Sequence, residues 1–319
     1  MFSSKHDQPT WFFSAGRCLK MHLAVWPFIR AGEYEVVWCH EFITLPTGLR
    51  YKQLHPRSRI VWDEHEIGII PPLARCQRLA AEACSVFVSV SEAILEHQIQ
   101  SLPALQTKAH CIPNVPTITR PPVPAPTGDV VRWVVIGMES KHLIESMRHF
   151  LAIWQECAPP WCTLDCYIMQ NTSRSYVPSR AFEDVRIANV TFHDPLPQGQ
   201  LAERLRSYDV GVAPYRMQGI FRQACPNKVG EYIHAGLAVL INSDLEWYSG
   251  VIDRLGCGVS ANIADPASAC RAIKSLSDRA AVDAFKRRSC EAARASWNYD
   301  AAIAPVMARL TEADPVERP

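Results

Sequence analysis

The chain has 319 residues, which exceeds the usual length of one domain and predicts about two, each able to bury its own core. Its 33 lysines and arginines nearly balance 32 acidic residues, giving a net charge of +1, and the basic residues are scattered; this argues against a nucleic-acid-binding face. The twelve cysteines form no C-x-x-C pair and no metal-like block, so we expect free, mostly buried thiols in a reducing, cytoplasmic setting.

The first thirty residues form an aromatic, mildly basic segment. Its large apolar side chains are Trp11, Phe12, Phe13, Leu19, Met21, Leu23, Trp26 and Phe28. Two interpretations stay open: a segment that lies at a membrane surface, or a packed first element of the fold. No signal peptide and no run of about 18 apolar residues is present, so we expect no membrane-spanning helix.

Short β-type runs alternate with helical stretches in the first third of the chain. The runs cover residues 36–39, 59–62 and 85–90, and residues 73–84 have helical composition. Strands that alternate with helices predict a parallel sheet. Residues 116–129 then hold five prolines in fourteen positions, a composition that favours an extended linker.

The same alternation returns after the linker. Candidate elements cover residues 133–136, 143–156, 163–168, 190–192, 199–208 and 210–213, and helices follow over 266–310. The predicted fold class is therefore α/β, with two Rossmann-like domains facing each other across a cleft. The predicted limits are residues 1–115 for the first domain, 116–129 for the linker, 130–290 for the second domain and 291–319 for a helical tail.

Residues 226–240 (PNKVGEYIHAGLAVL) join a polar loop, a short helix and a buried strand. Lys228 and Glu231 stand three positions apart, so they share a helix face near the N-terminus, where free backbone N–H groups attract anions. This arrangement suits a phosphate beside a sugar hydroxyl. The other interpretation is an amphipathic helix that carries a surface ion pair and ends at Gly236.

Acidic and histidine residues follow three of the predicted strands, and ligands of open parallel sheets bind beyond the carboxyl ends of strands. His40 and His65 are candidates to donate hydrogen bonds to sugar hydroxyls or to take a proton, with Glu41 and Glu66 fixing the imidazole tautomers. His193 follows a third strand. Helix-capping acids beside surface histidines are the alternative interpretation.

The stretch from Gly137 to Lys141 also follows a strand and opens a helix, so it is a candidate phosphate site, or else an ordinary turn with a solvated lysine. The chain has no H-E-x-x-H motif and no D-x-D motif, and we expect no bound metal and no cofactor. It also lacks the G-x-G-x-x-G, G-x-S-x-G and G-K-[ST] motifs of dehydrogenases, hydrolases and P-loop proteins.

With these residues in hand, the chain resembles the retaining, nucleotide-sugar-dependent glycosyltransferases of the GT-B fold, specifically glycosyltransferase family 4 (group 1), over roughly residues 35 to 300. The most specific match is residues 226–239, which are similar to P-N-K-x-x-E-Y-x-x-A-G-x-P-V. Further matches are residues 36–42 to V-x-x-H-[DE], 62–66 to Y-D-x-H-E, 90–92 to V-S-E, 112–116 to I-P-N-G, and 192–214 to the F-x-G…L-x-x-x-Y-x-x-A-D-[IV]-G-[LV]-x-P run.

The resemblance implies that residues 1–115 form an acceptor-side domain and residues 130–290 a nucleotide-sugar-binding domain, and it implies roles for several side chains. Glu231 corresponds to the second acid of an E-x7-E motif, which accepts hydrogen bonds from the donor ribose, and His40 to a histidine near the reacting carbon. Lys228 and Lys141 would stabilise the departing diphosphate. The remaining donor-binding candidates are Asn227, Gly137, Gln223 and His193. Retaining members react on one face of the sugar with help from the leaving phosphate, which requires neither a protein nucleophile nor a metal.

Two departures from the family pattern keep a second function open. Gln223 stands eight positions before Glu231, where many members have the first glutamate. Only about thirty-five residues precede the first strand end, and residues 14–16 are the one candidate for the missing Gly-Gly turn, so we expect a shortened N-terminal domain. The leading hypothesis is transfer from a UDP- or GDP-sugar to a glycan or lipid-linked acceptor in polysaccharide biosynthesis; the alternative is a non-catalytic nucleotide-sugar-binding or partner subunit.

Overall fold

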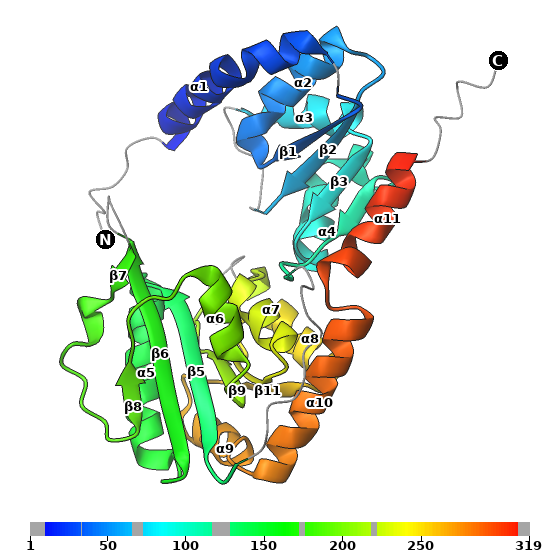
Figure 1. Ribbon diagram of the computed structural model, residues 1–319. Helices are drawn as coiled ribbons and strands as arrows, with labels where there is room; N and C mark the ends of the chain where they lie inside the picture. Colours follow the sequence, from blue (N-terminus) through cyan, green and yellow to red (C-terminus); the bar gives the residue numbers. More distant parts are fainter. Residues whose placement is uncertain are drawn as a thin grey trace. The chain divides into compact units, whose positions relative to one another are not determined.

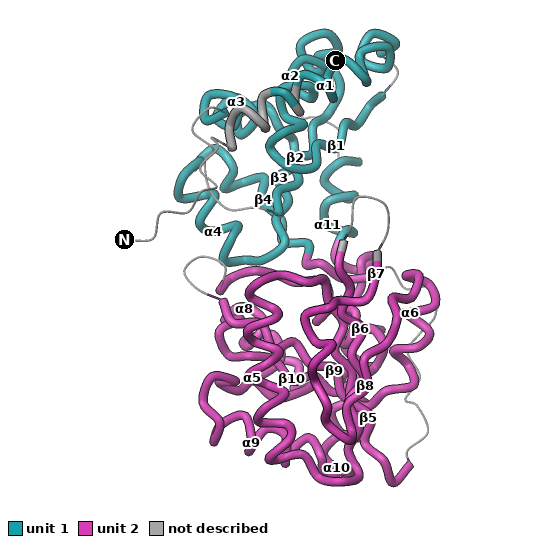
Figure 2. The backbone as a smooth tube through the Cα atoms, turned by 90° about the vertical axis from the view of Figure 1, so that its left-hand side faces the viewer, with its two compact units in different colours: residues 1–112, 303–319 teal, residues 113–302 magenta. Residues whose placement is uncertain are grey.

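The computed structural model describes residues 10–32, 34–65, 73–116, 128–171, 176–217 and 222–311. The chain divides into two compact units, Met1–Ile112 with Ile303–Pro319, and Pro113–Ala302 (Figure 2). The helical tail was predicted to begin at residue 291, which lies inside helix α10 (Arg279–Ala295). The chain instead passes from the second unit to the first between Ala302 and Ile303. Most of the predicted linker, residues 117–127, lies outside the described residues.

The first unit is built on four parallel strands that lie side by side in chain order (Figure 1). They are β1 (Val36–His40), β2 (Arg59–Glu64), β3 (Val86–Ser89) and β4 (Ala109–Cys111). The connecting helices are α2 (Leu45–Leu54), α3 (Ala74–Ala83) and α4 (Glu92–Ser101). The Ser91 hydroxyl caps α4 by accepting a hydrogen bond from the backbone N–H of Ile94 at 3.2 Å. In the core, the Trp62 and Phe87 rings meet edge to face.

Helix α1 (Thr10–Ala31) contains residues 14–16, so these residues do not form the predicted strand-to-helix turn. The inner face of α1 packs on α2, where Ile29 is buried and its carbonyl accepts a hydrogen bond from His55 Nε2 at 2.9 Å. The outer face exposes Leu19, Leu23 and Phe28 by 60%, 62% and 58%. No helix among the described residues is both long and apolar enough to cross a membrane.

The second unit has a sheet in the order β11-β10-β9-β5-β6-β7, with β8 also paired to β6; β7 is antiparallel to β6, and the other strand pairs are parallel. The strands are β5 (Val131–Met138), β6 (Cys162–Asn171), β7 (Tyr176–Pro178), β8 (Val190–Phe192), β9 (Val210–Ala213), β10 (Ala238–Asn242) and β11 (Gly258–Ala261). The chain leaves β5 toward β6 and later returns to its other side at β9. The carboxyl ends of β5 and β9 therefore form a topological switch point.

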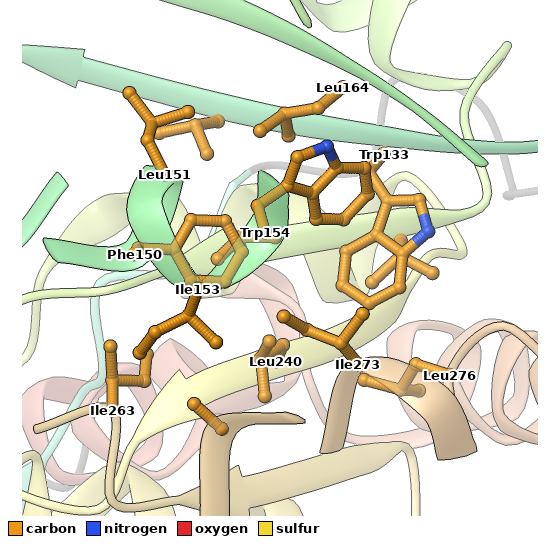
Figure 3. Packing of buried hydrophobic residues seen from close by; sticks show 14 of the residues in the cluster. Trp133, Phe150, Leu151, Ile153, Trp154, Leu164, Leu240, Ile263, Ile273 and Leu276 are labelled. Carbon is orange, nitrogen blue, oxygen red and sulfur yellow. The ribbon is translucent and has the colours of Figure 1, made fainter. Parts of the chain in front are cut away.

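Helices cover both faces of this sheet (Figure 1). They are α5 (Lys141–Cys157), α6 (Gln198–Leu205), α7 (Asn227–His234), α8 (Glu246–Leu255), α9 (Pro266–Ser275) and α10. Helix α11 (Tyr299–Thr311) follows them and belongs to the first unit from Ile303 onward. Asp265 caps α9 by accepting hydrogen bonds from the N–H groups of Ala267 and Ser268. Figure 3 shows the core beneath α5 and α9, where Trp133 and Trp154 pack edge to face with centroids 5.0 Å apart.

The expectation that all thiols are free is wrong for one pair, because Cys157 at the end of α5 and Cys270 in α9 form a disulfide with Cα atoms 5.5 Å apart. The two residues are 113 positions apart, so sequence spacing gave no signal. Among the other cysteines whose side chains the structure describes, nine are free, and seven of these are buried. Burial raises the pKa of thiols such as Cys39 and Cys257 to about 11, which makes them poor nucleophiles.

A thiol count tests this pairing. Denatured protein is expected to release two additional titratable thiols after treatment with a reductant, and the Cys157→Ser/Cys270→Ser variant is expected to release none. An unchanged count in the wild type would contradict the disulfide.

Candidate functional site

Helix α7 carries Glu231, and the next residue, Tyr232, holds this helix against the sheet. Tyr232 is fully buried; its hydroxyl donates to the Val212 carbonyl at 3.1 Å and accepts from the Ile136 N–H at 2.9 Å. These bonds join α7 to both β9 and β5. Gly236, with φ of +77°, ends the helix in the left-handed conformation that favours glycine. The position of Glu231 is thus fixed relative to the switch point.

Gly230 allows the backbone of Asn114 to approach helix α7 closely. A Cβ at this position would lie 2.3 Å from the backbone oxygen of Asn114. The Asn114 side chain in turn donates a hydrogen bond to the Cys225 carbonyl at 2.7 Å, so the segment after β4 is fastened to the start of α7. A larger residue at 230 requires the backbone to move.

We therefore expect Gly230→Ala to lower the free energy of unfolding by about 1–3 kcal/mol through overpacking. Urea denaturation measures the change. The matched control is Gly250→Ala in α8, where a Cβ meets nothing within 4 Å and where alanine is expected to stabilise the helix by about 0.5–1 kcal/mol. Equal effects of the two substitutions would contradict the role of Gly230.

Glu231 and Lys228 form an ion pair, with Oε1 and Nζ 3.5 Å apart and side chains exposed by only 24% and 29%. Burial raises the pKa of Glu231, and the charge and hydrogen bond of Lys228 offset part of that increase. Helix α7 begins at Asn227, and its cap residue, Pro226, supplies no side-chain hydrogen bond. The start of α7 thus offers an uncapped helix terminus, a cation and a half-buried carboxylate within two turns.

The same helix meets the carboxyl ends of β5 and β9. A Cβ on Gly137 would lie 2.7 Å from Leu143 Cδ2 and 3.5 Å from the Tyr215 hydroxyl, so the two strand ends are close. Tyr215 is half-buried; its removal from water raises its pKa, and the charge of Glu231 raises that pKa further. Gly137, Tyr215 and Glu231 therefore converge on the switch point of the sheet.

Lys141 and Gln223 contact acidic residues other than Glu231. Lys141 is the first residue of α5, its side chain is 83% exposed, and its Nζ lies 3.9 Å from Glu145 on the same helix. Gln223 donates to Glu246 Oε2 at 2.6 Å, and Arg222 pairs with the same carboxylate at 2.8 Å. Gln223 is thus joined to the start of α8, a contact that sequence spacing did not predict.

His193 belongs to a separate polar cluster on β6 and β8. Its ring stacks on Tyr167 with centroids 4.8 Å apart, and Nε2 lies 2.9 Å from Asp165 Oδ1. Tyr208 donates to the other oxygen of Asp165 at 2.6 Å, and Arg204 donates to the Tyr167 hydroxyl at 3.2 Å. His193 was predicted as a site residue, but its contacts with Asp165 and Tyr167 were not.

In the first unit, His40 and His65 lie beside one carboxylate. His40 ends β1, and its Nδ1 lies 2.7 Å from Asp63 Oδ2; His65 follows β2, and its Nε2 lies 3.3 Å from Asp63 Oδ1. Trp38 Nε1 also donates to Oδ2 at 3.0 Å. Burial by itself raises the pKa of Asp63, but the hydrogen bonds of His65 and Trp38 and the charges of both histidines lower it below its usual range.

Among the described residues, Asp63 rather than Glu41 is thus the acid in contact with these imidazoles. Glu41 has φ of +62°, and its Oε2 is buried without a hydrogen-bond partner among the described residues. Glu64 points into the core, where Trp62 Nε1 donates to it at 3.2 Å. Glu66 lies outside the described residues. The pairing register of β1 and β2 selects Asp63, and this register is not visible in the sequence.

His40, Asp63 and His65 also form a group whose possible ligand atoms lie within 4.8 Å of one another. Two histidines and one carboxylate are a donor set that zinc or another transition metal accepts. The sequence motifs for metals do not include this group, because its members come from two strands.

No protein-family model matches the chain, and no curated protein matches its sequence. Solved structures do match over nearly the whole chain. An α,α-trehalose-phosphate synthase (UDP-forming) from Burkholderia vietnamiensis is 14% identical, with a TM-score of 0.65 over 96% of this chain and 80% of that one. The N-terminal domain of trehalose-6-phosphate phosphatase from Candida albicans is 11% identical, with a TM-score of 0.67 over 98% and 77%.

WaaG, a glycosyltransferase involved in lipopolysaccharide biosynthesis, is 13% identical, with a TM-score of 0.55 over 84% of this chain and 83% of that one. Because these three structures are only 14%, 11% and 13% identical to the chain, their similarity establishes the fold alone. The predicted fold class, α/β with two Rossmann-like domains of the GT-B type, is confirmed.

Proposed function

We propose that the protein is a retaining glycosyltransferase that transfers a sugar from a UDP- or GDP-sugar to a glycan or lipid-linked acceptor. The observation that carries this proposal is the half-buried Glu231–Lys228 pair on α7, at the switch point of a GT-B-type sheet. In such sheets this is where nucleotides bind. The resemblance of residues 226–239 to the family 4 motif supports the same assignment.

In this proposal the Glu231 carboxylate accepts hydrogen bonds from the two ribose hydroxyls, and its low exposure strengthens those bonds. Lys228 and the start of α7 at Asn227 bind the diphosphate. The diphosphate would also contact the turn between Gly137 and Lys141, because the Lys141 side chain is 83% exposed and can be reached by a ligand. Gln223, joined to Glu246, and His193 complete the proposed donor contacts.

His40 is the proposed contact to the donor sugar near the reacting carbon. The two lysines supply the positive charge that a departing diphosphate needs, so we propose a reaction with no bound metal and no cofactor. The acceptor is deprotonated with help from the leaving phosphate on the same face of the sugar, which retains the configuration of the anomeric carbon. Glu41, His65 and Glu66 are proposed to lie near the acceptor.

Calorimetry with UDP and GDP, paired with a transfer assay, tests the proposal. Binding of a nucleotide together with transfer to an acceptor supports the enzyme. The second candidate, a non-catalytic nucleotide-sugar-binding subunit, is favoured by Gln223, which replaces an acid with an amide. Binding without transfer to any acceptor would support that candidate, and binding of neither nucleotide would contradict both.

We also propose that α1 holds the protein at the cytoplasmic face of a membrane. Its outer face exposes Leu19, Leu23 and Phe28, and the whole helix contains no acidic residue, while Lys20 and Arg30 are exposed. Apolar side chains beside cations suit an anionic lipid surface. Such attachment fits a lipid-linked acceptor.

Sedimentation with vesicles that contain anionic phospholipid tests whether the protein binds a membrane surface through α1. Leu19→Ser/Leu23→Ser is expected to lose binding, whereas Leu79→Ser, which changes a 47% exposed leucine of α3, is expected to keep it. Equal binding of the two variants would contradict a role for α1, without bearing on nucleotide binding.

A further inference from the structure

Tyr215 lies two residues after β9, close to the turn that opens α5. Its hydroxyl oxygen is 3.5 Å from the point that a Cβ on Gly137 would occupy, and Leu143 Cδ2 is 2.7 Å from the same point. Gly137 is the penultimate residue of β5, and Leu143 belongs to the first turn of α5. The hydroxyl is therefore at the carboxyl end of β5, where this strand leads into a helix.

The backbone around Tyr215 is fastened on two sides by buried polar side chains. The Tyr215 carbonyl accepts a hydrogen bond from Asn242 Nδ2 at 3.0 Å, and the N–H of Arg216 donates to Ser146 Oγ at 3.0 Å. Asn242 ends β10 and Ser146 lies in α5, and both are 0% exposed. Asn242 Oδ1 also accepts from the N–H of Ile263 at 3.2 Å, which fixes the orientation of the amide. The position of the Tyr215 ring is thus set before any ligand binds.

The hydroxyl of Tyr215 is not used within the described part of the protein. It makes no hydrogen bond to a described residue, although the side chain is half-buried and packs against the hydrophobic core of the second unit. Other tyrosines of this unit differ: the Tyr208 hydroxyl donates to Asp165, and the Tyr232 hydroxyl donates to the Val212 carbonyl. Polar groups in such positions are normally hydrogen-bonded, so this hydroxyl is available to a partner outside the protein.

The Tyr215 hydroxyl keeps its proton at neutral pH. Removal from water raises the pKa of Tyr215, and the negative charge of Glu231 raises that pKa further. A phenol that stays neutral is a hydrogen-bond donor, whereas the oxygens of a diphosphate are charged acceptors. Hydrogen bonds between such partners are stronger than those between two neutral groups.

We propose that the Tyr215 hydroxyl donates a hydrogen bond to a phosphate oxygen of the bound nucleotide diphosphate, which makes Tyr215 a further donor-binding residue. That the phosphate belongs to a nucleotide rests on the function proposed above. The hydroxyl lies beside the turn between Gly137 and Lys141, where the diphosphate is proposed to bind, and Glu231 is left for the ribose. Lys228 and Lys141 supply charge to the diphosphate, while Tyr215 supplies a neutral donor of fixed direction.

Calorimetry with the full chain tests the proposal, with UDP, GDP and the phosphate-free nucleosides uridine and guanosine as ligands. Tyr215→Phe removes the hydroxyl and keeps the ring. This variant is expected to bind the preferred nucleotide about 10- to 100-fold more weakly, as for the loss of a hydrogen bond to a charged group, and to bind the corresponding nucleoside like the wild type. In urea it is expected to be at least as stable as the wild type, since no bond to a described residue is lost.

The matched control is Tyr51→Phe in the first unit. The Tyr51 hydroxyl donates to the Tyr34 carbonyl at 3.0 Å and accepts from the Tyr34 N–H at 2.8 Å. Tyr51→Phe is therefore expected to be less stable than the wild type and to bind nucleotide normally. Both expected effects are the reverse of those for Tyr215→Phe.

Unchanged binding of UDP and GDP by Tyr215→Phe, alongside weakened binding by Glu231→Ala, would overturn the role of Tyr215 and leave the proposed function standing. Equal losses of affinity for the nucleotide and its nucleoside would overturn the phosphate contact. A loss of stability in Tyr215→Phe would overturn the proposal as well, because the hydroxyl would then be bonded within the protein. A wild type that binds neither nucleotide would overturn both the proposed function and this inference.

Discussion

Asp209→Asn is expected to destabilise the protein by about 3 kcal/mol or more, because it leaves a buried lysine charge without its partner. Asp209 precedes β9 and is 4% exposed; its Oδ1 accepts hydrogen bonds from Lys286 Nζ at 2.7 Å and Arg279 Nη1 at 2.9 Å. Oδ2 accepts from the Arg132 N–H of β5 at 2.9 Å. The Lys286 side chain is 2% exposed, so water cannot replace the lost carboxylate.

Denaturation in urea measures the loss, and a second variant separates charge from packing. Asp209→Asn/Lys286→Met removes both charges, and it is expected to be more stable than Asp209→Asn alone, since well-packed apolar replacements of a buried pair are often tolerated. If the double variant were the less stable of the two, the unpaired lysine would not be the cause.

The pH dependence of stability follows from the same group. Burial raises the pKa of Asp209, but Arg279, the Arg132 N–H and Lys286 lower it below its usual range. An acid whose folded pKa is lowered stabilises the fold above its unfolded pKa, about 3.9, and this contribution is lost as the pH falls through the folded value. Asp209→Asn is expected to lack this part of the acid transition.

Glu231→Ala is expected to weaken nucleotide binding about 10- to 100-fold, because it removes a charged acceptor whose hydrogen bonds contribute about 1.5–3 kcal/mol. Glu231→Gln keeps one acceptor oxygen and is expected to lie between alanine and the wild type. The matched control is Glu183→Ala, whose side chain is 72% exposed and which we expect to bind like the wild type. Calorimetry measures all three affinities.

The raised pKa of Glu231 adds a pH dependence to this binding. Affinity is expected to fall as the pH drops through that pKa, since the protonated acid is a weaker acceptor, and to fall at a higher pH than an ordinary glutamate, near 4.3, would produce. Glu231→Gln is expected to show no such fall. An identical pH profile for the wild type and this variant would show that Glu231 does not contact the nucleotide.

Substitutions of Asp209 and of Glu231 are expected to affect different properties, the stability of the fold and the binding of nucleotide. Asp209 lies at the amino ends of β5 and β9, and Glu231 lies near their carboxyl ends. Asp209→Asn that remains folded is therefore expected to bind nucleotide normally.

The sequence predicts the alternation of strands and helices well, because local periodicity carries that information. The helix of Glu231 is one example: an apolar pattern, Gly236 at its end and a buried strand after it define α7 and β10. Strands β4, β7 and β11 were missed, because three or four residues give little pattern, although β8 and β9 of the same length were predicted.

Contacts between distant residues were not predictable in the same way. No contact between Asp63 and the histidines was predicted, since the proximity of Glu41 to His40 in sequence says nothing about strand register. The bond between Cys157 and Cys270 and the pairing of Asp209 with Lys286 join segments far apart in the chain. Such partners are set by packing, which local residue patterns do not encode.

The central claim is that Glu231 binds the nucleotide of a sugar donor in an active transferase. Release of nucleotide from a panel of UDP- and GDP-sugars, measured for the wild type and for Glu231→Ala, tests it most directly. We expect the wild type to release nucleotide from a donor, and Glu231→Ala to do so about tenfold or more slowly. A wild type that neither binds nor hydrolyses any donor, together with an unaffected Glu231→Ala variant, would contradict it.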